Sequence, residues 1–581
     1  MSNFNPLDRA KIAVHRSSFD LSSKNLFTAK VGEILPAYWQ IAIPGTKYRI
    51  SSDWFTRTVP VNTAAYTRIK EYYDFYAVPL RLISRALPQA FTQMSDYMTS
   101  AVSNSENTPQ LTQVPYVSQA LLNTYLQTAN ANDQTNTRDD AGLPLVYGSC
   151  KLLDMLGYGS MIASSNTGKA AITKKYLGLD NLSDGVNPLV YEVSQTVNAL
   201  PFLAYQKVYF DFYSNSQWEK HLAYAYNVDY WTGGSSIALA ADMLKLRYAN
   251  YPKDYFMGML PNSQYGSVAT LSPVYSLADS RSIVSDNLVR AEGTLRSQAG
   301  SATPVLSSSS TISTNLRLNS DLSALSIRAT EYLQRWKEVA QFSSKDYSDQ
   351  MAARFGVKAP EYMGNHAHFI GGWSSVININ EVVNTNLDTD DSQASIAGKG
   401  VSSNSGHTLT YDCGAEHQVI MCVYHAVPLL DWDLTGQAPQ LTVTSISDFP
   451  EPAFDQLGMQ VVPSLNLQNN PGLSVVKGGS SALGYNLRYW QWKSNIDTVH
   501  AGFRKGTAYQ SWAAPLNGYQ VLTGSGAWSY QSMKVRPQQL NSIFVPQVDA
   551  ANCSVAFDQL LCNVNFQVYA VQNLDRNGLP Y

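Results

Sequence analysis

Charged residues are scarce in this sequence. Asp, Glu, Lys and Arg make up 15% of the 581 residues, whereas an ordinary soluble domain has roughly 25%. Neutral polar residues and 36 tyrosines take their place. A surface of neutral polar and aromatic groups loses its bound water at a lower free-energy cost than a surface rich in Lys and Glu. The composition therefore favours a protein with large interfaces, and it would equally suit a sugar-binding protein.

Cysteine is also scarce, and long apolar runs are missing. The five cysteines lie far apart and none belongs to a C-x-x-C motif, so we expect reduced, buried thiols and no disulfide framework. No eighteen apolar residues follow one another, and the segment MSNFNPLDRA has no apolar core of a signal peptide. We therefore expect no segment that directs the chain into or across a membrane.

The motifs of common active sites and metal sites are missing or incomplete. The segment around Gly168 fails as a phosphate-binding loop, because no glycine stands five residues before it and Ala170 replaces the required Ser or Thr. His366 and His368 would share one face of a strand, but no Cys or carboxylate stands nearby at ligand spacing. The acidic run at 384–391 lacks the glycine and the final glutamate of a calcium loop. We therefore expect no catalytic residue, no metal site and no cofactor, and a structural Ca²⁺ has no support in the sequence.

The beginning of the chain is basic. Residues 1–90 hold twelve Lys and Arg against six Asp and Glu, although the whole chain has a formal net charge of -3. Residues 1–30 contain turn-forming Ser and Asp without helical or strand periodicity of any length. We therefore predict an extended arm that becomes ordered against a partner. Its charge suits phosphate contacts, and a solvated charged surface is the simpler alternative.

Strand patterns occur at both ends of the chain. Residues 31–83 are rich in β-branched and aromatic residues and are broken by two proline-containing turns, which predicts three strands. The run at 416–432 is almost continuously apolar, as expected for a central strand covered on both faces. The segment at 484–503 is aromatic and also favours a strand. Residues 560–570 alternate between apolar and mostly polar side chains, which is the pattern of a half-buried strand.

The middle of the chain favours helices and loops. The clearest helix is predicted at 325–342, where apolar residues follow one face. Residues 266–323 are rich in Ser, Thr, Gly and Ala, which bury little surface. We therefore predict a β core made of residues 31–100 and 360–581, with helical and loop insertions at 101–359.

Short motifs at intervals along the whole chain match one pattern. They are FTRTVP, LPFLAY, YPKDYF, RFGVKAPEYMG and GLPY, which begin at Phe55, Leu200, Tyr251, Arg354 and Gly578. In these motifs the sequence resembles the major capsid proteins of microviruses (Microviridae), the small single-stranded DNA phages, and is gokushovirus-like.

The resemblance implies an eight-stranded antiparallel jelly-roll β-sandwich of the viral capsid type with long loop and helical insertions. It implies a structural, non-enzymatic protein that self-assembles into a T=1 icosahedral shell around a circular single-stranded DNA genome. The expected location is the virion, assembled in the cytoplasm of a bacterial host. The expected partners are other copies of the chain, the genome, a minor virion (pilot) protein and a host cell-surface receptor, with residues 266–323 as an exposed surface protrusion.

In this interpretation, the arm at residues 1–30 lies on the inner face of the shell. Basic side chains neutralise phosphates, and aromatic rings stack on unpaired bases. We therefore predict that DNA is contacted by Arg9, Lys11, Arg16, Phe19, Lys24 and Phe27. The alternative role of these residues is to join neighbouring subunits.

Two other classes of protein fit parts of the sequence. Eleven tryptophans, 36 tyrosines and many Asn and Gln would suit a secreted glycan-binding or glycan-cleaving β-sandwich protein. The paired carboxylates of a glycosidase are defined by their separation in space, so the sequence leaves this alternative open, but a secreted protein is expected to carry a signal peptide. A phage tail or fibre protein is expected to show repeats or coiled-coil heptads, and neither pattern occurs.

Overall fold

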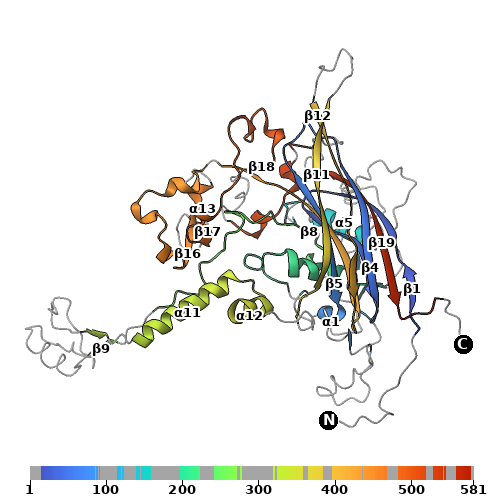
Figure 1. Cartoon of the computed structure of the whole chain (residues 1–581), viewed down its shortest axis with the longest axis horizontal. Coiled ribbons are helices and arrows are strands. Elements are labelled where there is room, and N and C mark those ends of the chain that lie inside the picture. Colours follow the sequence, from blue (N-terminus) through green and yellow to red (C-terminus); the bar gives the residue numbers. More distant parts are fainter. Residues whose placement is uncertain are drawn as a thin grey trace, which may run out of the picture. The chain divides into compact units, whose positions relative to one another are not determined.

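Strands from both ends of the chain pair with one another in the computed structural model (Figure 1). The statements below refer to the residues that the structure describes, which are 15–84, 87–88, 91, 114–118, 121–122, 139–143, 145–158, 196–222, 225, 241–270, 275–277, 318–320, 324–357, 364–383, 396–434, 436–467, 482–517, 528–540, 542–544 and 558–576.

Two antiparallel sheets form the main body. In spatial order, the first sheet consists of β1 (Ser17–Asp20) and β2 (Ser23–Ala29), then β19 (Leu560–Gln572), β4 (Lys47–Thr58), and finally β12 (Ile396–Ser405) and β13 (Leu409–Asp412). The second sheet consists of β11 (His368–Val383), β5 (Ile69–Pro79), β14 (Gln418–Pro428), β3 (Glu33–Ala42) and the short β8 (Arg247–Tyr248). The last strand of the chain is therefore held between strands from its beginning.

The strand β11 belongs to both sheets. Its residues 368–377 pair with β5 of the second sheet, and its residues 378–383 pair with β12 of the first. A strand that changes sheets in this way makes a corner of a sandwich. Eight strands of the two sheets (β2, β3, β4, β5, β11, β12, β14 and β19) have seven residues or more. The structure confirms the predicted antiparallel jelly-roll β-sandwich.

Aromatic side chains fill the space between the two sheets. The ring centroids of Trp54 on β4 and Tyr73 on β5 are 5.2 Å apart. Those of Phe566 on β19 and Phe75 on β5 are 6.0 Å apart. All four side chains are buried, so the core itself joins the first hundred residues to the last strand.

The burial of β14 and β19 follows the patterns in the sequence. Every residue of β14 is buried, because β3 and β5 flank this strand and both of its faces are covered. In β19, Val564 and Phe566 are buried whereas Leu561 and Asn565 are exposed. The predictions for 416–432 and 560–570 are confirmed.

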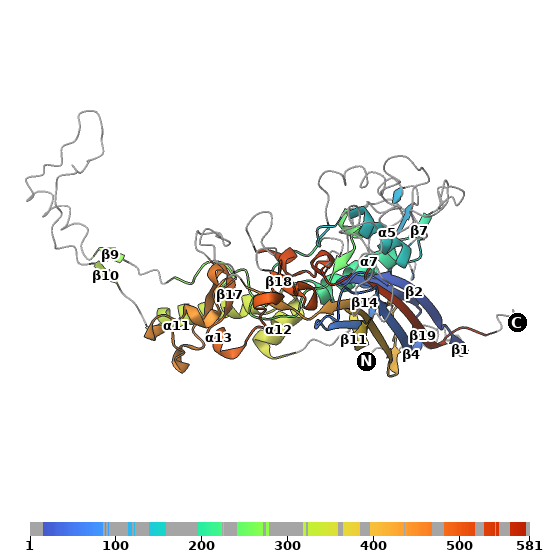
Figure 2. The same ribbon diagram turned by 90° about the horizontal axis from the view of Figure 1, so that it is seen from above.

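Helices cover the outer face of the second sheet (Figure 2). The helix α7 (Leu200–Val208) contacts β5 and β14, and α5 (Leu145–Met155) contacts β3. The Tyr205 hydroxyl donates a hydrogen bond to the carbonyl of Ile34 at 2.8 Å. The Trp39 indole N–H donates to the carbonyl of Leu156 at 2.9 Å. The other short elements here are α1 (Leu80–Ile83), β6 (Tyr116–Ser118) paired with β7 (Thr196–Asn198), the π-helical turn η2 (Tyr209–Tyr213) and η3 (Ala241–Leu244).

The segment between β14 and β19 forms small elements of its own. Its strands are the parallel pair β15 (Asp431–Asp433) and β18 (Pro515–Asn517) and the antiparallel pair β16 (Met459–Pro463) and β17 (Ala482–Leu487). Its helices are α13 (Trp490–Lys493) and the short turns η6 (Pro439–Thr442), η7 (Ile446–Asp448), η8 (Pro452–Phe454), η9 (Ser464–Asn466), η10 (Ala501–Phe503), η11 (Gln510–Trp512), η12 (Tyr530–Met533) and η13 (Pro537–Leu540).

The structure corrects two predictions in this segment. The sandwich strands at this end of the chain stop at Pro428 and resume at Leu560, so residues 360–581 are core only in part. The aromatic segment at 484–503 is a strand only at its beginning, because Tyr489 has a left-handed φ of 60° and α13 follows. Aromatic residues favour strands mainly through packing against neighbouring strands, and such a neighbour, β16, is available only to β17.

The expected extended arm differs from the structure over residues 17–29. These residues form β1 and β2 against β19. Strands of four and seven residues contain too few alternations to be recognised in a polar segment. Residues 1–14 of the expected arm lie outside the described residues.

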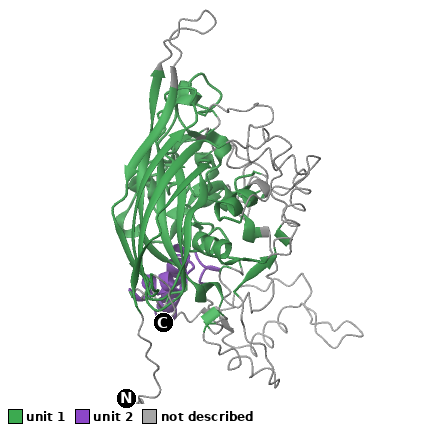
Figure 3. Cartoon of the chain, turned by 90° about the vertical axis from the view of Figure 1, so that its right-hand side faces the viewer, with its two compact units in different colours: residues 1–261, 357–581 green, residues 262–356 purple. Residues whose placement is uncertain are grey.

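The chain divides into two compact units, of which unit 1 comprises residues 1–261 and 357–581 and unit 2 comprises residues 262–356 (Figure 3). Unit 2 contains α11 (Ala324–Phe342), α12 (Tyr347–Phe355) and the antiparallel pair β9 (Tyr275–Leu277) and β10 (Leu318–Ser320). The helix α11 confirms the prediction at 325–342. Most of the predicted protrusion at 266–323 lies outside the described residues. Among the described helices, none has the length and apolar character needed to span a membrane.

Candidate nucleic-acid interface

The outer face of the first sheet is exposed. In Figure 3, most strands of unit 1 lie on the left side of this unit and most of its helices lie on the right side. Successive side chains of a strand point to opposite faces, so Lys47, Arg49 and Arg57 of β4 are exposed whereas Tyr48 and Trp54 are buried. We call this surface the open sheet face. It is defined by the outward side chains of Arg16, Asp20, Lys24, Leu26, Lys47, Arg49, Asp53, Phe55, Arg57, Asp412, Leu561, Asn563, Asn565 and Tyr569.

Positive charge gathers on the open sheet face. Five basic side chains from the first ninety residues belong to it, against three acidic ones. Among the described residues, no carboxylate forms an ion pair with Lys24, Arg49 or Arg57. Adjacent strands of a sheet are about 4.8 Å apart, so a polyanion that lies across the strands meets several of these cations.

The three acidic side chains are engaged by their neighbours. The Asp412 carboxylate accepts the backbone N–H of Gly414 at 3.0 Å and pairs with Lys47 at 3.2 Å, and these contacts lower the pKa of Asp412. The hydroxyl and the N–H of Ser22 lower the pKa of Asp20. The Asp53 carboxylate accepts a hydrogen bond from the amide of Gln567 at 3.0 Å.

Apolar and aromatic side chains lie beside the cations. The Arg57 guanidinium lies 4.8 Å from the ring centroid of Phe55, and Tyr569, which is 50% exposed, stands opposite Arg49 in the strand register. A hollow of about 400 Å³ is lined by Leu26, Phe27, Thr28, Phe55, Arg57, Leu561, Cys562 and Asn563. Cations that follow a strand of phosphates and flat groups on which bases stack are the two components of single-stranded nucleic acid sites.

The structure places four of the six predicted DNA-contact residues. Arg16 and Lys24 are exposed on the open sheet face, and the Arg16 Nε donates to the Asn573 side chain at 2.7 Å. Phe19 is half-buried in β1 opposite Ala570. Arg9 and Lys11 lie outside the described residues.

The stacking role predicted for Phe27 is corrected. Phe27 is 8% exposed, and its ring packs against Tyr424 in the core with the centroids 5.2 Å apart. Because side chains alternate along β2, the exposed neighbour is Leu26, which is 68% exposed. The sequence alone contains no register for this segment, and the pairing of β2 with β19 turns Phe27 toward the core.

Other members of the open sheet face were not singled out from the sequence. In the sequence, Arg49 belongs to the basic beginning, Arg57 also to the motif FTRTVP, and Tyr569 to a predicted strand. The signal that identifies Arg49 and Arg57 is the alternation of KYRISSDWFTRT, which puts Lys47, Arg49, Asp53, Phe55 and Arg57 on the same side of one strand.

The residues considered for metal binding have other partners. The His366 ring lies 3.8 Å from the carboxylate of Asp211, which also pairs with Lys207 at 3.0 Å. Across the described parts of the chain, no three His, Cys, Asp or Glu side chains are placed to hold a metal ion. The acidic run at 384–391 and the segment around Gly168 lie outside the described residues.

Comparison with known proteins shows similarity to capsid proteins. A family model described as "Capsid protein (F protein)" matches residues 10–125 and 181–575. The "Capsid protein VP1" of Chlamydia phage 1 is 24% identical over 222 residues, which cover 36% of this chain and 37% of that protein. The aligned part therefore spans little more than a third of the relative, whereas the family match includes strands of both sheets and the open sheet face.

Proposed function

Because this chain belongs to the capsid protein (F protein) family of microvirus major capsid proteins, we propose that it self-assembles into a T=1 icosahedral shell that encloses a circular single-stranded DNA genome. The observation that carries this proposal is the family match over both ends of the chain, which together build the jelly-roll sandwich. Membership in a capsid family indicates a structural protein and not an enzyme.

The fold is suited to repeated self-association. A jelly-roll keeps its two sheets fixed while long connections between strands present contact surfaces. A closed shell needs heterologous contacts whose rotations close into rings, and a stable contact of this kind buries about 1,600 Å². A surface with few charges loses water readily in such contacts. Many modest contacts between copies of the chain then together stabilise the particle.

The open sheet face supports contact with single-stranded DNA on the inner side of the shell. Its cations would neutralise phosphates, and the hollow beside Phe55 and Arg57 offers a place for a base. The proposal also includes the partners expected in this family, namely a minor virion (pilot) protein and a host cell-surface receptor. Assembly would take place in the cytoplasm of the bacterial host.

Measurement of particle mass tests the proposal. The full chain is expressed in bacteria and purified, and its mass is determined by light scattering and by imaging of single particles. Sixty copies of a 64.0 kDa chain give about 3.8 MDa, and we expect a uniform particle of this mass. A stable monomer that binds glycans would contradict the proposal and support a glycan-binding β-sandwich protein.

A further inference from the structure

Large apolar side chains gather on one exposed surface of unit 1. Residues 444–457, which include the turns η7 and η8, are all exposed except Asp448. Ile446, Phe449, Phe454 and Leu457 are 91%, 61%, 49% and 62% exposed. A large exposed apolar patch on a soluble chain marks an interaction site. We call it the turn surface and define it by these four residues together with Asp448 and Glu451.

Hydrogen bonds hold the turn surface in a fixed conformation. The Asp448 carboxylate accepts the backbone N–H groups of Thr444 at 3.0 Å and Ser445 at 2.9 Å, and these contacts lower the pKa of Asp448. This carboxylate is therefore negatively charged at neutral pH. In the next turn, the N–H of Leu457 donates to the carbonyl of Phe454 at 3.0 Å, and side chains three residues apart in such turns lie on the same side. A surface that is already ordered loses little conformational entropy on binding.

A second exposed surface of unit 1 consists of aromatic rings. Tyr66, which precedes β5, is 69% exposed, and Tyr509 is 55% exposed. The ring centroid of Tyr66 lies 5.3 Å from that of Trp512 and 6.1 Å from that of Phe503, whose centroid lies 5.9 Å from that of Tyr509. Two segments far apart in the sequence thus form one cluster of rings, and Tyr and Trp are the residues that contribute most to binding between proteins. We call it the ring surface and define it by these four residues together with Arg68 and Lys505.

The loop at 500–512 is fixed by its own backbone. The N–H of Tyr509 donates to the carbonyl of Gly502 at 2.9 Å, and the N–H of Tyr66 donates to the carbonyl of Trp512 at 2.5 Å. Ala501 has a left-handed φ of 52°, a conformation that costs free energy for a residue with a side chain. Such backbone strain occurs often in binding segments. The rings of this surface are therefore held in place before any partner binds.

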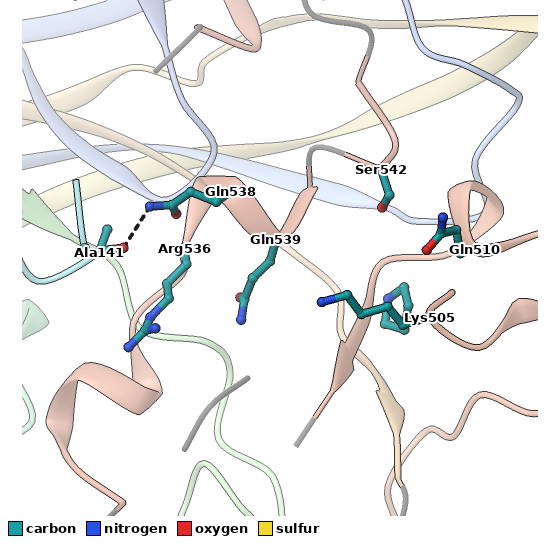
Figure 4. A pocket seen from close by; sticks show the side chains of 9 residues that line it. Ala141, Lys505, Gln510, Arg536, Gln538, Gln539 and Ser542 are labelled. Carbon is teal, nitrogen blue, oxygen red and sulfur yellow. Dashed lines mark hydrogen bonds between the residues drawn. The ribbon is translucent and has the colours of Figure 1, made fainter. Parts of the chain in front are cut away.

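The two surfaces carry opposite charge. Residues 431–476 contain five acidic residues and no Lys or Arg, whereas residues 498–548 contain four basic residues and no Asp or Glu. In the described part of the chain, no cation forms an ion pair with Glu451, and no carboxylate forms one with Arg68 or Lys505. Lys505 also lines a cavity of about 380 Å³, and none of the side chains labelled there in Figure 4 is a carboxylate. Complementary charge of this kind guides two surfaces together and fixes their register.

We propose that the turn surface of one copy of the chain binds the ring surface of a second copy. The apolar side chains of the turn surface pack against the rings, and its carboxylates face Arg68 and Lys505. Because two different surfaces take part, the contact is heterologous, and its repetition around an axis closes a ring of copies. The inference rests on the proposed function for the need to close a shell, and it adds which surfaces meet.

Two variants of the full chain test the contact, because each removes one surface and keeps the other. Ile446→Ser/Phe449→Ser alters the turn surface, and Tyr66→Ser/Tyr509→Ser alters the ring surface. Association is measured by sedimentation velocity below the concentration at which particles form. We expect each variant alone to associate about tenfold more weakly than the unmodified chain. An equimolar mixture of the two variants should form pairs, since it contains one intact surface of each kind.

Charge and specificity are tested in the same mixture. Glu451→Lys, added to the chain with the intact turn surface, should weaken the pairs, and Arg68→Glu/Lys505→Glu in the other chain should restore part of the loss. An unchanged strength after Glu451→Lys would overturn the role of charge. The matched control is Leu26→Ser/Leu561→Ser, which removes two exposed apolar side chains from the open sheet face and should leave the association of the unmodified chain unchanged.

A mixture that associates no more than its two separate components would overturn the proposal. Loss of association in the control of the open sheet face, with none in the variants of the turn and ring surfaces, would overturn it as well and would assign the contact to that face. The altered side chains are exposed, and the melting temperature of each variant verifies that it folds. Particles are imaged in parallel. Failure of the unmodified chain to form particles rejects the proposed function, whereas particles that both variants form as readily as the unmodified chain reject the contact alone and leave the turn surface to a partner outside the shell.

Discussion

Glu71 lies on β5 inside the sandwich and is 0% exposed. Its carboxylate accepts hydrogen bonds from the Trp54 indole at 3.0 Å and the Thr56 hydroxyl at 2.8 Å, both on β4 of the first sheet. On its own sheet it accepts the Ser375 hydroxyl at 2.6 Å. A buried carboxylate is tolerated where such donors surround it, so Glu71 ties the two sheets together within an otherwise aromatic core.

Replacement of Glu71 tests this role. We expect Glu71→Ala to lower the free energy of unfolding by about 3 kcal/mol, because it leaves several buried donors without an acceptor. Glu71→Gln retains one acceptor oxygen and should lose less. Denaturant unfolding of the unassembled chain measures both, with Glu381→Ala at an exposed position of β11 as the control. A loss as small as that of the control would show that the hydrogen bonds contribute nothing.

The two short strands β1 and β2 close one edge of the first sheet. They pair with β19 along most of its length, and β2 contributes Phe27 and Ala29 to the core. A sheet edge that loses its neighbour presents unpaired N–H and C=O groups, which promotes association with other chains. At the scale of elements, these strands therefore act in folding as well as in any contact with DNA.

Two truncations separate these roles. Deletion of residues 1–14 leaves β1 and β2 in place and should leave the melting temperature within about 2 °C, since it removes none of the described core residues. Deletion of residues 1–29 removes both strands and exposes β19, so we expect insoluble protein or a melting temperature lower by more than about 5 °C. Scanning calorimetry and the soluble fraction after expression measure the difference. Equal stability of the two truncated chains would contradict a folding role for β1 and β2.

The strand β4 presents Arg49 and Arg57 on the open sheet face. We expect the double variant Arg49→Ser/Arg57→Ser to form particles with about half the DNA or less and with a weaker dependence of DNA retention on salt, because two phosphate contacts are lost. The control Lys220→Ser/Lys253→Ser removes the same charge at two exposed positions outside this face. DNA content per particle is read from the ratio of absorbance at 260 and 280 nm.

The predicted arm is tested in the same assay. Arg9→Ala/Lys11→Ala and Arg16→Ala/Lys24→Ala are compared as separate pairs, and each should lower packaged DNA while shells still form. Unchanged DNA content with fewer particles would instead assign these residues to contacts between subunits.

Several buried carboxyl groups give the whole molecule a pH-dependent stability. Burial raises the pKa of Asp74 to about 6 and that of Asp139 to about 7, whereas an unfolded Asp titrates near 3.9. Between these values the folded chain binds more protons than the unfolded chain, so the free energy of unfolding falls as pH rises.

Asp558 acts in the opposite direction. Burial alone would raise its pKa, but Lys151 and Lys30 hold it below the usual value, and this stabilisation is lost below about pH 4.

We therefore expect the unassembled chain to be most stable at mildly acidic pH. Asp74 and Asp139 together should make the free energy of unfolding about 5 kcal/mol higher at pH 4.5 than at pH 7.5, and the buried His425, whose pKa burial lowers to about 3, should offset about half of this difference. The double variant Asp74→Asn/Asp139→Asn keeps an acceptor oxygen at each position and should therefore be less stable at pH 4.5 than at pH 7.5, because the contribution of His425 remains. Denaturant unfolding at the two pH values provides the measurement, and a variant with the slope of the unmodified chain would refute the assignment.

Much of the sandwich was predictable because its signals are local. The continuous apolar run of β14 and the alternation of β19 each reflect how many faces of a strand are covered, and a reader of the sequence sees that directly. The sequence does not predict β1 and β2, because these strands are short and polar. It predicts too much strand after Pro428, because β propensity leads to a strand only where a neighbouring strand is available.

The candidate sites depended on register and on contacts between distant segments. Strands at both ends of the chain, a basic beginning and few charges elsewhere can be read from the amino-acid sequence alone. The orientation of Phe27 toward the core and of Leu26 toward the solvent, and the position of Arg49 opposite Tyr569, follow only from the folded chain. Hydrophobic periodicity is a property of one strand, whereas strand pairing brings together residues whose separation in sequence carries no such signal.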